Sequence, residues 1–231
     1  MKKEAEKESV RRIVAAATAE FAEVGYAGAR VDAIAKRAGL NKAAIYYHIG
    51  GKRELYEYVV NALAADVRER TLRDIQAASS PEEKLRRYIR NLARAIDDNP
   101  SIAPIVLREM AARGEHLSEG FFHTLFSLLF TLTQILTEGA QQGVFVPTIP
   151  MVVHFMSIGP LLLFKIRGTL LSENTRLSEI LNRSFEAFPH PMPNDFQEIV
   201  HTLKNQPVEN TEYNIVEEIE TFILKAVKRE T

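Results

Sequence analysis

The sequence contains no cysteine. This absence excludes a disulfide framework, a thiolate metal site and a cysteine nucleophile, and it suits a protein of the reducing cytoplasm. The chain also lacks an uninterrupted apolar run of the roughly 20 residues that a helix needs to span a bilayer. Its two most apolar stretches, residues 121–136 and 149–165, are interrupted by His123 and His154. We therefore expect two buried helices in a cytoplasmic protein that does not associate with membranes.

Motifs of the common enzyme and cofactor sites are missing as well. The six histidines are scattered, and no His-Glu-x-x-His spacing occurs. Gly50-Gly51-Lys52 does not make a phosphate-binding loop, because Tyr46 stands where the first glycine belongs and Arg53 follows the lysine. We therefore expect no enzymatic activity, no metal and no cofactor.

Charge is distributed unevenly along the 231 residues. Residues 1–53 hold 11 Lys and Arg against 6 Asp and Glu, a balance of +5, so the remaining residues carry −6 to reach the net charge of −1. A positive N-terminal block on a nearly neutral chain is typical of a protein that binds DNA with one part only. The first twelve residues are too charged for a signal peptide. They form either an ordinary solvated face or a mobile arm near phosphate or the minor groove.

The segment near the N-terminus has the pattern of a helix-turn-helix. Apolar residues at three- and four-residue steps predict a long first helix that ends at Gly25, since glycine makes a good left-handed cap. A second helix of about two turns, residues 31–38, is broken by Gly39. Asn41 can then cap a third helix, residues 42–48, by accepting a hydrogen bond from its unpaired backbone N–H groups.

The third helix has a short inward side, Ile45 and Ile49, which leaves other side chains available to a DNA major groove. In DNA-binding helix-turn-helix units the N-terminal residues of the second helix meet base edges, while donors around it hold phosphates. The alternative is a short helical hairpin with a solvated basic face. The candidate DNA-binding residues here are Asn41, Lys42, Ala43, Tyr46, Tyr47, His48 and Lys52, of which Lys52 is a cation placed to reach a phosphate.

This segment resembles the TetR (tetracycline-repressor) family over about the first fifth of the chain. The matching residues are Gly25-Tyr26, Ile34-Ala35, Ala38-Gly39-Leu40, Ile45-Tyr46-Tyr47-His48 and Lys52-Arg53-Glu54-Leu55. Beyond them the resemblance extends only to length and all-helical character. It implies base contacts from Lys42, Ala43 and Tyr47, and phosphate contacts from Tyr46, His48 and Lys52.

The segment departs from the family pattern at a few positions. Arg30 replaces the usual Ser or Thr before the second helix; it cannot cap a backbone donor, but its planar fork can reach a phosphate. Asp32 would repel phosphate, so it either accepts from a cytosine amino group or pairs with a nearby arginine, and we favour the pairing. Ile49 keeps an aromatic position apolar, and Arg53 adds positive charge where the family is usually acidic.

Past residue 52 the chain has the pattern of successive helices with no convincing strand. Ser80-Pro81-Glu82-Glu83 is a capping box with proline at the first helical position, a strong helix start. We predict an all-α fold, with a homeodomain-like helix-turn-helix domain at 1–52 and a helical-bundle effector and dimerisation domain at 53–231. The expected helices of the second domain span about 53–76, 81–96, 102–113, 118–142, 150–171, 176–188, 195–204 and 212–229.

Two of these helices, 118–142 and 150–171, are apolar nearly all round and need partners on more than one side. They can occupy the centre of a bundle, a self-association face or the wall of a ligand cavity. Polar groups within such runs need partners, which a ligand could supply. The alternative for either histidine alone is a core residue whose hydrogen bonds are made within the protein. The candidate residues for a small apolar or aromatic effector are His123, Phe126, Gln134 and His154.

The family resemblance implies a homodimer closed by a four-helix contact, with a pocket inside each bundle. Two helix-turn-helix units related by a twofold axis can bind half-sites about one helical turn apart, so we expect a double-stranded DNA operator with an inverted repeat. The expected function is a repressor whose DNA binding a ligand relieves by tilting the helix at 53–76. The alternative is a helical small-molecule or lipid-binding module with a degenerate DNA-binding motif.

Overall fold

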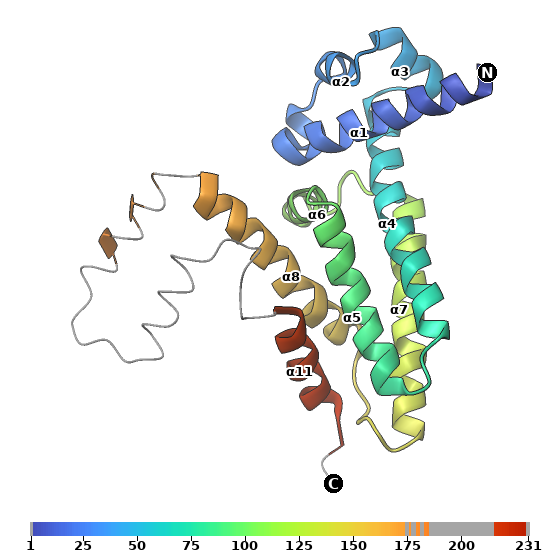
Figure 1. The fold of residues 1–231 in the computed structure, drawn as a ribbon, viewed down its shortest axis with the longest axis vertical. Coiled ribbons are helices and arrows are strands. Elements are labelled where there is room, and N and C mark those ends of the chain that lie inside the picture. Colours follow the sequence, from blue (N-terminus) through green and yellow to red (C-terminus); the bar gives the residue numbers. More distant parts are fainter. Residues whose placement is uncertain (1, 174–175, 177–178, 181–182, 185–214, 230–231) are drawn as a thin grey trace.

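The computed structural model describes residues 2–173, 176, 179–180, 183–184 and 215–229, and this part of the chain is almost entirely α-helical. Three helices form a unit at one end, and α4 leads from this unit into a helical bundle (Figure 1). The expected helices at 176–188 and 195–204 lie largely or wholly outside the described residues. The bounds are α1 Lys2–Gly28, α2 Val31–Ala38, α3 Lys42–His48, α4 Lys52–Gln76, α5 Pro81–Asp98, α6 Ile102–Ala111, α7 Glu119–Gln141, α8 Pro150–Glu173 and α11 Ile215–Val227.

Two of the three local signals of the N-terminal unit, Gly39 and Asn41, act as the sequence predicts. Gly39 adopts the left-handed conformation, with φ 64°, directly after α2. The side chain of Asn41 accepts a hydrogen bond of 2.8 Å from the backbone N–H of Ala44, which caps α3. At Gly25 the backbone also has positive φ, 72°, but the chain kinks there and stays helical to Gly28. The predicted end of the first helix is therefore a kink.

The predicted alternative of a mobile N-terminal arm is wrong, because residues 2–12 belong to α1. Arg12 fixes this helix to its neighbour: its guanidinium donates to the backbone carbonyls of Ala38 and Gly39. These carbonyls lie at the C-terminal end of α2, where backbone acceptors are unpaired and positive charge is favoured. Arg12 therefore supports the helix-turn-helix from within.

Two groups of buried side chains organise the molecule. The first joins α1, α2 and α3 to the beginning of α4 and to one residue of α6; its fully buried members include Ile13, Phe21, Ile34, Ile45 and Leu55. The second lies in the bundle, where α5 packs against α4, α7, α8 and α11. Helix α4 contributes side chains to both groups and so connects the N-terminal unit to the bundle.

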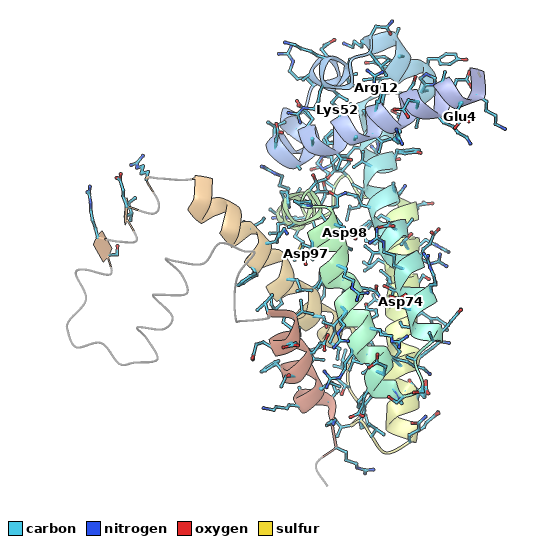
Figure 2. The ribbon with its side chains drawn as sticks, in the orientation of Figure 1. Glu4, Arg12, Lys52, Asp74, Asp97 and Asp98 are labelled. Carbon is cyan, nitrogen blue, oxygen red and sulfur yellow. The ribbon has the colours of Figure 1, made fainter. Side chains whose placement is uncertain are left out.

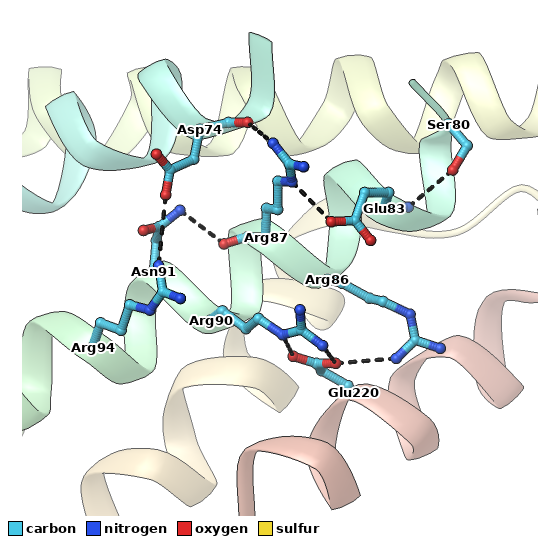
Figure 3. Close-up of polar contacts among 9 residues, drawn as sticks. All are labelled: Asp74, Ser80, Glu83, Arg86, Arg87, Arg90, Asn91, Arg94 and Glu220. Atoms are coloured by element: carbon cyan, nitrogen blue, oxygen red, sulfur yellow. Dashed lines mark hydrogen bonds and ion pairs between the residues drawn. The ribbon is translucent and has the colours of Figure 1, made fainter. Parts of the chain in front are cut away.

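Helix α11 is attached to α5 by a charged clamp (Figure 3). Glu220 of α11 is fully buried. Arg90 of α5 donates to both of its carboxylate oxygens, at 2.6 and 3.0 Å, and Arg86 adds a third contact at 3.0 Å. Such a two-pronged arginine contact fixes direction as well as distance. It holds the last described helix in one register against the bundle.

The two most apolar helices bury one side each. Helix α7 packs against α4, α5 and α8, yet Phe126 and Phe130 on its outer side are 60% and 64% exposed. By length and composition alone α7 could cross a membrane. On α8, Val152, Phe155 and Leu163 are likewise more than half exposed. The structure thus leaves apolar surface on both helices.

Candidate DNA-binding surface and effector cavity

Helix α3 presents one side to solvent and anchors the other. Ile45 is fully buried beneath it, whereas Asn41, Lys42 and Ala43 at its N-terminal end are exposed. Tyr47 is 78% exposed, an unusual position for a large apolar ring unless a partner covers it. The N-terminal turn of α3 and its outer face therefore have the geometry of a helix that enters a DNA groove.

Asp32 forms an ion pair with Lys42, one of the residues expected to contact DNA bases. Its carboxylate accepts from the Lys42 ammonium at 3.1 Å, and both side chains are largely exposed. The predicted pairing of Asp32 is therefore present, but the predicted arginine partner is wrong. An exposed pair of this kind contributes little to stability, so Lys42 can exchange Asp32 for a base edge.

The residues that are predicted to contact DNA phosphates lie around α3. Tyr46 is 52% exposed. His48 is half-buried and meets the Tyr47 ring edge-to-face, with centroids 5.0 Å apart. Arg30 precedes α2 and makes no capping bond with its side chain, as expected. Within the described part of the chain its guanidinium has no ion-pair partner, which leaves it available for a phosphate.

Lys52, the first residue of α4, is held in place by the N-terminal unit. Its ammonium lies 4.7 Å from the centre of the Tyr26 ring and donates to the backbone carbonyl of Ala27 at 3.2 Å. The carbonyl and the aromatic face position the charge without neutralising it. Figure 2 shows Lys52 and Arg12 at the N-terminal end of the molecule, while Asp74, Asp97 and Asp98 lie along the bundle.

The bundle contains a partly open cavity of about 560 Å³ between α4, α5, α6, α7 and α8. This volume is typical of a small-molecule site. Most of the lining is aliphatic or aromatic, with polar side chains only from Glu109, Arg113 and His154 among the described residues. Since α4 supplies Val60, Leu63, Ala64 and Val67 to the wall, an occupant touches the helix that begins at Lys52.

His154 is a buried titratable group whose pKa is shifted. It is 4% exposed, and its Nδ1 lies 2.8 Å from the hydroxyl of fully buried Tyr88. Burial lowers the pKa of His154 from 6.5 to about 4, because the charged imidazolium loses its hydration. Burial also raises the pKa of Tyr88. The pair is therefore uncharged at neutral pH.

Three of the four predicted effector residues do not line this cavity. His123, Phe126 and Gln134 lie on the exposed stripe of α7, and their placement in a pocket is a wrong prediction. The cause is that α7 is apolar on every side, so its sequence does not reveal which side faces inward. Phe121 and Phe122, two neighbours of His123, do line the cavity.

Sequence reasoning missed a polar cluster that joins the cavity wall to the N-terminal unit. Glu109 is 4% exposed and accepts from the Tyr56 hydroxyl at 2.6 Å, from His116 Nδ1 at 3.1 Å and from the backbone N–H of His116 at 3.3 Å. Burial and the contact with Glu109 raise the pKa of Tyr56. The His116 ring lies 4.1 Å from the ring of Tyr26, which in turn carries Lys52. Successive contacts through His116 and Tyr26 therefore connect Glu109 in the cavity wall to Lys52 beside the proposed DNA-binding surface.

Comparisons with known proteins match both parts of the chain. A family model described as bacterial regulatory proteins of the tetR family matches residues 13–59, and one described as the tetracyclin repressor-like C-terminal domain matches residues 81–187. The chain is 28% identical over 113 residues to the HTH-type transcriptional regulator LmrA of Bacillus subtilis, covering 48% of this chain and 60% of that protein. It is 25% identical over 146 residues to the HTH-type transcriptional regulator RutR of Escherichia coli K12, covering 63% and 68%.

A solved structure shares the whole fold. A TetR family transcription regulator from Marinobacter aquaeolei VT8 superposes over 100% of both chains with a TM-score of 0.68, at 17% sequence identity. This likeness concerns the fold alone. The two family models and the helix-turn-helix geometry together establish that this chain belongs to the TetR family of bacterial regulatory proteins.

Proposed function

We propose that the protein is a cytoplasmic transcriptional repressor that binds an inverted-repeat operator in double-stranded DNA as a homodimer and is released by a small apolar or aromatic effector. The observation that carries the proposal is α3: its start is capped by Asn41, its inner side is anchored by Ile45, and its outer side presents Lys42 and Tyr47 to solvent. The helix-turn-helix domain comprises residues 1–52, and residues 53–231 bind the effector and form the dimer. No catalytic role is assigned to either part.

The dimer is proposed to form through α8 and α11, which pack side by side in one subunit. Val152 and Phe155 on α8 and Phe222 on α11 are 52%, 54% and 60% exposed. Two such helices from each subunit make a four-helix contact about a twofold axis. The same axis places two copies of α3 on successive half-sites of one operator, about 34 Å apart along the duplex.

Release is proposed to act through α4. This helix touches the cavity with Val60 and Leu63 and starts at Lys52 beside the DNA surface. An effector that fits better when α4 is tilted shifts the population toward a spacing of recognition helices that no longer fits both half-sites. A coupling free energy of about 1–3 kcal/mol corresponds to roughly 5- to 150-fold weaker operator binding.

The test begins with selection of an operator from fragments of the source genome, followed by mobility shifts at several salt concentrations. Lys52→Ala is expected to weaken binding to all sequences and to flatten the log-log salt slope by about 1, because one phosphate contact is lost. Lys42→Ala is expected to change base preference. Arg73→Ala, at an exposed position in the last turn of α4 and far from α3, is the matched control and leaves both properties unchanged.

The same measurements separate the repressor from the second candidate function. The apolar cavity also fits a helical small-molecule or lipid-binding module whose DNA-binding motif is degenerate. Such a module binds its ligand but selects no operator. If an operator is selected and neither lysine variant alters its binding, the proposed DNA-binding surface is wrong.

A further inference from the structure

The polar side chains of the cavity wall differ in the hydrogen bonds and solvation that they already have. Both carboxylate oxygens of Glu109 accept hydrogen bonds from Tyr56 and His116. Arg113 lies at an exposed position, where water solvates its charge. His154 is buried, and within the part of the chain that the structure describes only its Nδ1 has a hydrogen-bond partner. The Nε2 atom of His154 is therefore a buried polar atom that an occupant of the cavity can satisfy.

The partner of Nδ1 determines where the imidazole proton lies. Tyr88 is fully buried, and among the described residues its hydroxyl has no acceptor other than His154 Nδ1, at 2.8 Å. If Nδ1 carried the proton, the hydroxyl hydrogen of Tyr88 would be buried without an acceptor, which is costly. Tyr88 therefore donates to Nδ1, and the proton of the neutral ring lies on Nε2.

The same contact orients the ring. The Nδ1 edge of His154 faces Tyr88, which does not line the cavity, whereas His154 itself does. The part of the ring away from Tyr88 carries Nε2–H, and this is the part of His154 that an occupant of the cavity can meet. Because burial keeps the pKa of His154 near 4, this donor is uncharged at neutral pH. The wall near His154 consequently combines apolar surface with one neutral hydrogen-bond donor.

We propose that the cavity selects an uncharged, mainly apolar molecule with a carbonyl oxygen, such as a ketone, ester or amide, which accepts a hydrogen bond from Nε2–H of His154. This inference deepens the effector site of the proposed function and rests on it. A pure hydrocarbon leaves the donor unsatisfied. An ammonium group has no lone pair to accept with, and a carboxylate beside His154 is buried without a cation.

Matched probes test the proposal on the full-length protein. The first pair is benzophenone and diphenylmethane, which differ by a carbonyl in place of a methylene; the second pair is 2-undecanone and undecane. Titration calorimetry is expected to give about tenfold tighter binding of each ketone, the usual effect of one buried hydrogen bond. In His154→Phe this difference is expected to disappear, whereas His154→Gln, which keeps an N–H donor, retains part of it.

Two spectroscopic measurements report on the hydrogen bond itself. The carbonyl stretching band of bound benzophenone is expected at lower frequency in the wild-type protein than in His154→Phe. Nitrogen-15 spectra of labelled histidine are expected to place the proton of His154 on Nε2 and to lose this preference in Tyr88→Phe. A proton on Nδ1 in the wild-type protein would contradict the inferred tautomer and with it the proposal.

The outcomes distinguish this inference from the proposed function. Equal affinity for both members of each pair overturns the carbonyl selection and leaves the cavity as the effector site. Failure of all four probes to bind overturns the selection together with the proposed effector site. Operator binding by the ligand-free protein, measured in parallel, tests the DNA-binding function independently of both results.

Discussion

At the scale of single residues, burial changes the protonation chemistry of His154. A histidine that is neutral in the folded protein but titrates normally when unfolded binds fewer protons in the folded state. Its pKa is about 4 when folded, against 6.5 for the ordinary side chain. Its contribution to stability is therefore fully present above pH 6.5 and is lost as the pH falls toward 4.

This linkage gives a prediction for His154→Gln, which keeps an acceptor for Tyr88 but does not titrate. Between pH 7 and pH 4 the free energy of unfolding of the wild-type protein is expected to fall by about 3 kcal/mol more than that of the variant. Urea denaturation at a series of pH values measures the difference. His123→Gln, at an exposed position of α7, is the control and is expected to follow the wild type. Parallel curves for wild type and His154→Gln would show that His154 is not desolvated.

The local structure of the proposed DNA-binding surface was more predictable from the sequence than the lining of the cavity. Asn41 and Gly39 act through atoms within a few positions along the chain, so short motifs reveal them. Glu109 acts on Tyr56, 53 positions away, and no local pattern predicts that contact. His154 was identified because a polar group in an apolar run must find a partner. The same argument failed for His123, since water is also a partner.

At the scale of helices, the ends of a helix can be predicted from its capping residues, whereas the side that faces inward cannot. Helix α5 begins at Pro81 as predicted, because the hydroxyl of Ser80 accepts from the backbone N–H of Glu83 at 3.2 Å. Helices α2 and α3 also have their predicted bounds. The inward side of α7 could not be predicted, because packing against α4, α5 and α8 selects it and every side of the helix is apolar.

The contact between α4 and α6 gives the second prediction. Tyr56 on α4 donates to Glu109 on α6 at 2.6 Å, and both side chains are buried. In a double-mutant cycle of Tyr56→Phe and Glu109→Gln, we expect a coupling of about 1 kcal/mol in the free energy of unfolding, because Tyr56→Phe removes the buried hydrogen bond and Glu109→Gln removes the charge of its acceptor.

Equilibrium denaturation of the four proteins measures this coupling. The matched cycle uses Tyr58→Phe with Glu109→Gln, since Tyr58 lies on α4 two residues further on but is 47% exposed. There the two effects are expected to add within about 0.5 kcal/mol. Additive effects in both cycles would mean that Tyr56 and Glu109 do not hold the N-terminal unit to the bundle.

At the scale of the whole molecule, charge and apolar surface are separated along the length of the protein. The N-terminal 53 residues carry +5 and the rest −6, so the field that attracts DNA is confined to one end. Apolar side chains remain exposed on α8 and α11, in the bundle. Exposed apolar surface of this kind marks a protein contact. A dimer formed there leaves both positive ends available to one duplex.

Charged substitutions in the dimer face give the last prediction. The double variant Val152→Asp/Phe222→Asp introduces two carboxylates into the proposed four-helix contact without touching the α3 surface, since Val152 lies on α8 and Phe222 on α11. Sedimentation equilibrium is expected to show a monomer in place of a particle of twice the chain mass. Operator binding is expected to weaken by about 10²- to 10⁴-fold, because two linked half-site contacts become independent.

The control for this variant is Phe130→Asp on α7, at a position that is 64% exposed but outside the proposed contact. Circular dichroism shows whether each variant keeps its helices. The salt slope supplies a further criterion: a monomer on one half-site neutralises half as many phosphates, so the log-log slope should fall by about half. A dimer that persists in the double variant, or one that dissociates in Phe130→Asp, would move the contact from α8 and α11 to α7. In that case the twofold axis, and with it the expected spacing of half-sites, would have to be placed elsewhere on the bundle.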